Sequence, residues 1–151
     1  MTIDIPGREP VTFEYVVLDF NGTLAVDGQV TSAVEKLLKE VASRYATIIA
    51  TADTFGTAKS FAERLAVPLR IVQTGQDKEE LIESLKGGAV AIGNGVNDER
   101  MFVAANLAVA IMGPEGAALQ TLLAADIVVP NVERALELLI HPNRLVATLR
   151  E

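Results

Sequence analysis

The sequence predicts an α/β protein with a doubly wound, Rossmann-like and mostly parallel sheet that is covered by helices on both faces, in three layers. Short apolar runs alternate with helical patterns almost without interruption, which is typical of parallel strands joined by right-handed crossovers. These runs are continuously apolar rather than alternating, as in "YVVLDF" (15–20). A strand that is covered on both faces has this composition.

Two hairpins are expected near the beginning of the chain. Residues 2–5 and 10–13 are separated by Pro6-Gly7, a turn signal, and they predict an N-terminal hairpin within residues 1–14. Asp27-Gly28 lies at the centre of "AVDGQV" and predicts a second hairpin, a flap, over residues 25–30.

Six short runs rich in Val, Ile, Leu and Ala predict buried strands, and the segments between and after them carry helical patterns. The first helix has Val34, Leu37, Leu38 and Val41 on one stripe, with Ser32 as its expected cap. The predicted strands are 15–20, 45–51, 69–73, 89–93, 107–112 and 126–130. The predicted helices are 32–43, 57–66, 77–86, 97–106, 114–124 and 131–140.

Length and composition limit the class of protein. The chain has 151 residues, a net charge of −7 and no cysteine, so we expect one domain over 1–151 without disulfides or thiolate metal sites. An acidic chain disfavours nucleic acid as a partner. No apolar run approaches the ~20 residues of a membrane helix, and the N-terminus lacks a signal-peptide pattern. We therefore expect a cytoplasmic protein with no membrane partner.

Polar residues follow three of the predicted strands at the point where each strand ends. These residues are Asp19, the run Thr51-Ala52-Asp53, and the segment 93–98, "GNGVND". Ligands bind beyond the carboxyl ends of the strands in open parallel sheets. Each residue alone fits a turn or a helix cap, but together they predict one polar crevice.

Asp19 is the strongest candidate for chemistry. An aspartate at the end of a Val-Val-Leu run is costly to bury unless it has partners. It could be a turn or cap residue, or a nucleophile that accepts a phosphoryl group as an aspartyl-phosphate. Gly22 would let the backbone approach a phosphate, and Thr23 would offer its hydroxyl and amide.

Four segments together resemble the haloacid dehalogenase (HAD) superfamily. "DFNGTL" is similar to its first motif, Asp-x-Asp-Gly-Thr, and "IIATADT" is similar to the second. "QDKEELIESL" supplies the third-motif lysine as Lys78, and "VAIGNGVNDERMF" resembles the fourth motif. The last two blocks are most similar to the phosphorylation domain of P-type ATPases. The resemblance extends from Tyr15 through nearly the whole remaining chain.

The resemblance implies a hydrolase of the phosphatase type that uses Mg²⁺. The implied catalytic residues are Asp19, Asn21, Thr51 and Lys78. The implied phosphate-binding residues are Gly22, Thr23, Thr51, Ala52, Lys78 and Asn97. The implied metal ligands are Asp19, the main-chain carbonyl of Asn21, Asn94, and Asp98 directly or through water.

Two positions depart from the superfamily pattern. Asn21 replaces the aspartate that protonates the leaving group and activates water, a role typically worth 10²–10⁴-fold. Asn94 replaces a metal-binding aspartate, so we expect weaker metal affinity unless Asp53 or Asp98 compensates. P-type ATPases also lack an aspartate at the first position, and there the aspartyl-phosphate is long-lived.

The chain has no room for a substrate-selecting cap domain, either between Thr23 and Thr51 or between Asp53 and Lys78. We therefore expect a small or macromolecular phosphorylated substrate, or a second copy of the chain that covers the site. The alternative is a catalytically weak phosphate-binding or regulatory module. Dehalogenation would need a capped apolar pocket, and ion transport would need membrane segments.

Two further positions have weaker functional indications. His141 is followed by Pro142 and is expected at a helix end. Phe55-Gly56 follows the second motif and either lines the entrance or packs.

Overall fold

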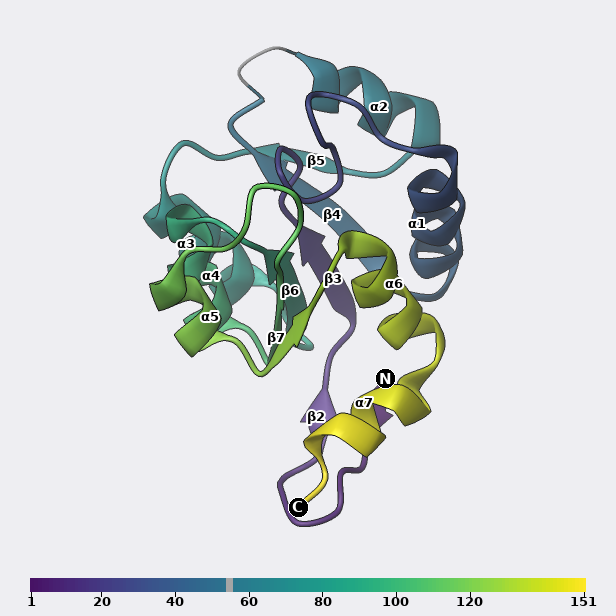
Figure 1. The fold of residues 1–151 in the computed structure, drawn as a ribbon, viewed down its shortest axis with the longest axis vertical. Coiled ribbons are helices and arrows are strands. Elements are labelled where there is room, and N and C mark those ends of the chain that lie inside the picture. The colour runs from purple at the N-terminus through teal and green to yellow at the C-terminus, as the bar shows by residue number, and fades with distance from the viewer. Residues whose placement is uncertain (54–55) are drawn as a thin grey trace.

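A six-stranded sheet forms the centre of the computed structural model, which describes residues 1–53 and 56–151 (Figure 1). The strand order is β5-β4-β3-β6-β7-β8, and every neighbouring pair is parallel. The strands are β3 (Tyr15–Leu18), β4 (Ala46–Thr51), β5 (Leu69–Ile71), β6 (Ala89–Gly93), β7 (Leu107–Ile111) and β8 (Ile127–Val129). The predicted parallel sheet is confirmed.

The register places the ends of the central strands together. Leu18, the last residue of β3, pairs with Ile49 on one side and with Ile92 on the other. Because the three strands run in the same direction, the residues that follow them emerge at one edge of the sheet. We call this edge the carboxyl edge.

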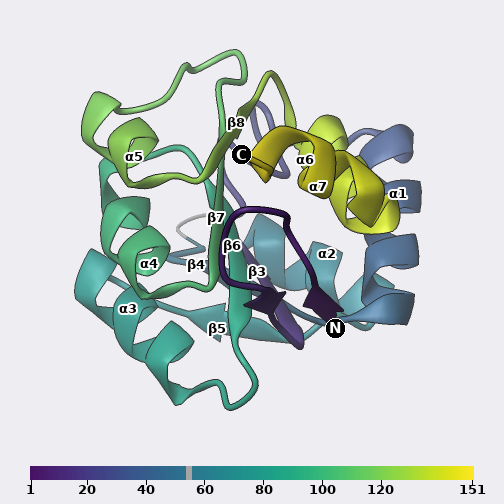
Figure 2. The same ribbon diagram turned by 90° about the horizontal axis from the view of Figure 1, so that it is seen from below.

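Helices cover both faces of the sheet, so the three-layer, doubly wound prediction is also confirmed (Figures 1 and 2). One face carries α1 (Ser32–Arg44), α2 (Thr57–Leu65) and α6 (Val132–Ile140). The other face carries α3 (Gly75–Ser84), α4 (Glu99–Ala104) and α5 (Leu119–Ala124), with the short 3₁₀ turn η1 (Val96–Asp98) before α4. None of the helices in the described residues is long and apolar enough to cross a membrane.

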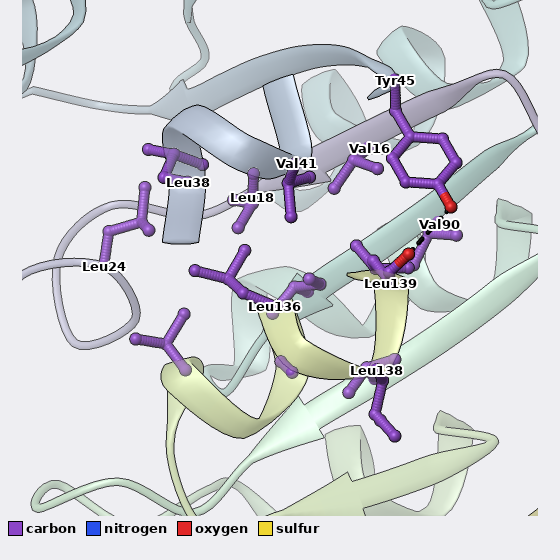
Figure 3. Close-up of a cluster of buried hydrophobic side chains, with 14 of the residues drawn as sticks. Val16, Leu18, Leu24, Leu38, Val41, Tyr45, Val90, Leu136, Leu138 and Leu139 are labelled. Carbon is purple, nitrogen blue, oxygen red and sulfur yellow. Dashed lines mark hydrogen bonds between the residues drawn. The ribbon is translucent and has the colours of Figure 1, made fainter. Parts of the chain in front are cut away.

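The larger core lies between the sheet and helices α1 and α6 (Figure 3). Leu18 of β3, Leu38 of α1 and Leu136 of α6 belong to this core, and all three are fully buried. Each such side chain contributes about 1.5–3 kcal/mol by leaving water. The Tyr45 hydroxyl donates a hydrogen bond of 2.9 Å to the Leu139 carbonyl, which ties the end of α1 to α6.

Side-chain hydrogen bonds at the helix ends explain why some predicted helix boundaries were wrong. Thr31, not Ser32, caps α1, because its hydroxyl accepts the Val34 amide at 3.2 Å. Helix α3 begins at Gly75 rather than at 77, because Thr74 and Asp77 form a reciprocal capping box. Helix α5 is confined to Leu119–Ala124, and residues 114–118 form a loop instead of its predicted first turns.

The two predicted hairpins differ in extent. β1 (Thr2–Ile3) and β2 (Val11–Thr12) form an antiparallel pair shorter than the predicted arms. Over 25–30 the chain makes a tight turn in which Val26 and Gln29 exchange backbone hydrogen bonds. Asp27 and Gly28 at its tip have φ of 51° and 78°, as a two-residue hairpin turn requires.

An additional helix, α7 (Pro142–Leu149), follows α6 and was not predicted. His141 lies at the junction of the two helices, in agreement with the helix-end prediction.

Both chain ends lie at the edge of the sheet opposite the carboxyl edge (Figures 1 and 2). The Met1 amino group donates to the Phe13 carbonyl at 2.9 Å. The Glu151 amide donates to the Pro6 carbonyl at 3.2 Å, so the C-terminus is bound to the N-terminal hairpin.

Candidate active site

A pocket of about 380 Å³ lies at the carboxyl edge. The structure brings the three predicted strand ends together there, since residues that follow β3, β4 and β6 all line it. The lining residues are Asp19, Asn21, Thr51, Ala52, Asn94, Gly95, Asn97, Glu115, Gly116, Ala117 and Ala118.

Three buried charged side chains lie together at this edge, and of the three only Asp19 lines the pocket. The Lys78 ammonium lies 2.6 Å from Asp98 Oδ1 and 3.2 Å from Asp19 Oδ1. Lys78 is 2% exposed and Asp98 is fully buried, so the pairs are shielded from solvent screening. The contacts of Asp19 with other described residues use Oδ1, which also accepts the Phe20 amide at 2.9 Å. Asp19 lines the pocket, and its Oδ2 makes no hydrogen bond or ion pair with the described residues.

The charges of this trio do not balance, and the imbalance shifts two pKa values. Burial, and after it the neighbouring Asp98 carboxylate, raise the pKa of Asp19 from 3.8 to about 6, against the lowering effect of Lys78. Burial alone would lower the pKa of Lys78, but Asp19 and Asp98 together outweigh it and leave the pKa raised. Lys78 is therefore a permanent cation beside Asp19 at neutral pH.

Asp98 organises the loop that follows β6. Its Oδ2 accepts the amides of Asn94 and Gly95 at 2.9 and 3.0 Å, while its Oδ1 binds Lys78. A Cβ atom at Gly93 would overlap this carboxylate, so glycine is needed there. Asp98 is fully buried and does not line the pocket. The geometry thus favours a positioning role over the predicted metal ligation.

Thr51 and two backbone amides form the opposite wall. The Thr51 hydroxyl accepts the Asp53 amide at 3.3 Å and keeps its own proton available for a ligand. Among the described residues, the amides of Asn21 and Ala52 have no acceptor. Two amides and a hydroxyl that lack acceptors in the wall of a pocket suit the oxygens of a phosphate.

The side chain of Asp53, a candidate replacement for a metal-binding carboxylate, is engaged at the start of α2. Its oxygens accept the amides of Ala58 and Lys59 at 2.8 and 3.1 Å, so the side chain caps α2. Phe55 lies outside the described residues.

Gly22 and Thr23, which are predicted to bind phosphate, use their amides within the turn after Asp19. Their amides donate within the turn, to the carbonyls of Ala25 and Phe20 at 2.8 and 3.2 Å. Neither residue lines the pocket, and the Thr23 hydroxyl is buried without a partner in the described part of the chain. These two residues shape the turn after Asp19, because Gly22 has a φ of 76°.

The oxygen donors in the pocket suit a hard divalent cation, although they bring little charge. They are an Asp19 carboxylate oxygen, the Asn21 carbonyl and the Asn94 amide, and such oxygens are the ligands that Mg²⁺ prefers. The described residues contain no group of three or more His, Cys, Asp or Glu side chains placed to hold a metal. A metal here would depend on mixed carboxylate, amide and carbonyl ligands.

Glu115 is a pocket residue that the sequence analysis did not identify. It lies on the loop between β7 and α5, over Gly22, where a Cβ on Gly22 would collide with its carboxylate. The only signal in the sequence is the stretch Gly113-Pro114-Glu115-Gly116 directly after an apolar run.

A sequence comparison identifies one relative of uncharacterized function. An uncharacterized protein of Methanocaldococcus jannaschii is 48% identical over 62 residues, which are 41% of this chain and 67% of that protein. The chain belongs to the same family as this archaeal protein. No family model matches the chain.

The solved structures with similar folds include hydrolases and transport ATPases. A putative HAD family hydrolase from Streptomyces avermitilis has a TM-score of 0.66 and 21% identity, over 91% of this chain and 84% of its own. A 3-deoxy-D-manno-octulosonate 8-phosphate phosphatase from Moraxella catarrhalis, in complex with magnesium and phosphate, has a TM-score of 0.67 and 19% identity, over 91% and 94%.

The catalytic domain of the CPx-ATPase CopB-B has a TM-score of 0.60 and 24% identity, over 72% of this chain and 44% of its own. The chain therefore has the fold of HAD hydrolases, without a cap domain, and shares it with the catalytic domains of P-type ATPases.

Proposed function

We propose that the chain is a Mg²⁺-dependent phosphohydrolase or phosphotransferase that acts through an aspartyl-phosphate on Asp19. The observation that carries the proposal is the buried Lys78 ammonium, 3.2 Å from Oδ1 of Asp19, a residue that lines the pocket and whose Oδ2 has no partner among the described residues. A carboxylate held in this way has one oxygen anchored and the other available for attack. The fold of phosphatases that bind magnesium and phosphate supports the same proposal.

In the proposed reaction, Asp19 Oδ2 attacks the phosphorus atom of a phosphate ester. A bond from this oxygen to phosphorus forms while the bond from phosphorus to the leaving oxygen breaks, and the leaving group takes a proton from water. Lys78 and the amides of Asn21 and Ala52 neutralise or bind the phosphoryl oxygens. Asp19, the Asn21 carbonyl and Asn94 would hold the metal, which supplies further positive charge at those oxygens. Water, or another acceptor, then removes the phosphoryl group from Asp19.

Turnover is proposed to be slow, because Asn21 cannot donate or accept the proton in either step. The loss of a positioned general acid or base typically costs 10²–10⁴-fold. The substrate is a phosphorylated molecule, and the lack of a cap leaves room for a macromolecule or for a second copy of the chain over the pocket.

The test is release of phosphate from a generic aryl phosphate, with Mg²⁺ and with a chelator. We expect slow, metal-dependent release that Asp19→Asn abolishes. Equal release by the wild type and by Asp19→Asn would overturn the assignment of the nucleophile.

A second candidate function is a phosphate-binding or regulatory module, which the two asparagines Asn21 and Asn94 favour. Asn21→Asp separates the two candidates, since restoring the acid should accelerate an enzyme about 10²-fold and leave a binding module silent. Asn143→Asp is the matched control, because it adds the same charge at an exposed position of α7, outside the pocket.

A further inference from the structure

We infer that Glu115 supplies the metal site with the carboxylate that Asn94 lacks. The inference deepens the proposed function and rests on its metal site. Glu115 comes from the loop between β7 and α5, whereas the other proposed ligands follow β3 and β6.

The first support is position. The Glu115 carboxylate and Asn94 Nδ2 both lie within 3.4 Å of the point that a Gly22 Cβ would occupy. Glu115, Asn94 and Asp19 line the same pocket. The side chain that brings charge is thus beside the amide that brings none, and next to the turn whose Asn21 carbonyl is a proposed ligand.

The second support is that the Glu115 loop is attached to the segment after β6. Asn94 Nδ2 donates to the Gly116 carbonyl at 3.0 Å, and the Ala118 amide donates to the Asn94 carbonyl at 2.9 Å. The Thr121 hydroxyl donates to the Gly95 carbonyl at 2.7 Å. These bonds hold Glu115 at the pocket and orient Asn94, whose Nδ2 is engaged and whose Oδ1 is the end suited to a cation.

The third support is the balance of charge. Asp98 is bound by Lys78 and two amides, and Asp53 caps α2, so both are engaged elsewhere. In the described part of the chain, Glu115 is the one remaining carboxylate that lines the pocket with Asp19. Glu115 makes no hydrogen bond or ion pair with the other described residues, so nothing there competes for its oxygens. Affinity for a hard cation rises with the number of charged oxygen ligands.

The test measures metal binding rather than turnover. Mn²⁺ titrations followed by the paramagnetic resonance of free Mn²⁺, and Mg²⁺ titrations by calorimetry, should show about tenfold weaker binding in Glu115→Gln. Glu83→Gln is the matched control, because Glu83 is exposed near the end of α3 and lies outside the pocket. It removes the same charge and should leave the affinity unchanged. Because Glu115 is exposed, its variant should unfold like the wild type in chelator.

A second pair of variants tests compensation. Asn94→Asp should restore affinity in the Glu115→Gln background and should raise it less in the wild type. Equal gains in both backgrounds would mean that the two positions act independently, and this would overturn the inference.

Asp19→Asn distinguishes a failure of the proposed role of Glu115 from a failure of the metal site itself. If it weakens Mn²⁺ binding while Glu115→Gln does not, the metal site stands and the role of Glu115 is wrong. If neither variant weakens binding, the metal site itself is wrong. Tighter phosphate binding by Glu115→Gln, with unchanged metal affinity, would instead show that Glu115 repels the substrate, and it would also overturn the inference.

Discussion

The two ends of the central sheet are built from different kinds of residue. At the carboxyl edge, Asp19, Lys78 and Asp98 are the buried charged side chains of the described residues. At the opposite edge, the N-terminal hairpin and α7 bury only apolar side chains against the strands, among them Phe13, whose ring lies 5.3 Å from that of Tyr45. The candidate active site lies at one end, and apolar side chains pack at the other.

The comparison teaches that the two ends contribute to stability with opposite sign. Burying an apolar ring is favourable in itself. Burying charges is unfavourable, and the cost is offset only while every charge has its partner. Variants at the carboxyl edge should therefore change activity as well as stability, with a sign of the stability change that depends on which charge is removed, whereas variants at the opposite edge should change stability alone.

The largest effect is expected from Lys78→Met. Without the ammonium, Asp19 and Asp98 become buried carboxylates without a counter-charge, and breaking such a pair typically costs about 3–5 kcal/mol. Urea denaturation at pH 8 in chelator would measure this loss in the free energy of unfolding. The loss should shrink near pH 5, where Asp19 gains its proton.

Two controls test whether charge causes that loss. Lys36→Met removes an exposed lysine and should stay within about 0.5 kcal/mol of the wild type. Adding Asp98→Asn to Lys78→Met should recover part of the stability. If Lys78→Met alone were as stable as the wild type, the stability of the protein would not depend on the ammonium between Asp19 and Asp98.

A smaller loss, about 3 kcal/mol, is expected from Phe13→Ala at the opposite edge, since it leaves a cavity beside Tyr45. Urea denaturation would measure it. The kcat/KM for phosphate release should change less than about twofold at a temperature where the variant is folded. A large fall in kcat/KM would instead show that the two ends are coupled.

The smallest effect should be a gain in stability from Asp19→Asn. The folded-state pKa of Asp19, about 6, lies above its ordinary value of 3.8. The folded protein therefore holds the proton more tightly, and the stability of the wild type falls as pH rises from about 4 to 6. Asparagine has no such dependence.

In chelator, Asp19→Asn should thus be more stable than the wild type by about 1–3 kcal/mol at pH 8, with little difference near pH 4. Urea denaturation at both pH values would measure it. A variant that is less stable at pH 8 would contradict the unfavourable charge of Asp19.

The sequence predicted the strands and their polar ends well, because apolar runs report burial directly. It placed Asp19, Thr51 and Asn94 at one edge, and the register of β3, β4 and β6 brings them together. Helix boundaries depended on side-chain hydrogen bonds, such as the one at Thr31, that alternative caps nearby could equally have made.

The remaining differences arise from contacts between distant segments. Residues 114–118 carry a helical pattern but form a loop, because Gly116 and Ala118 bond to Asn94. Glu115 is brought to the pocket by the same bonds, and its place after the apolar run of β7 was the only local signal. Thr23 matches its motif, but its amide donates a hydrogen bond to the Phe20 carbonyl within the turn.

The binding of the C-terminus to the N-terminal hairpin has a practical consequence. Since both ends lie away from the carboxyl edge, a chain tethered to a solid support through either end would present its pocket to the solution (Figure 1). Immobilised molecules would share one useful orientation whichever end is attached. Residues of the pocket could therefore be changed without changing how the protein is attached.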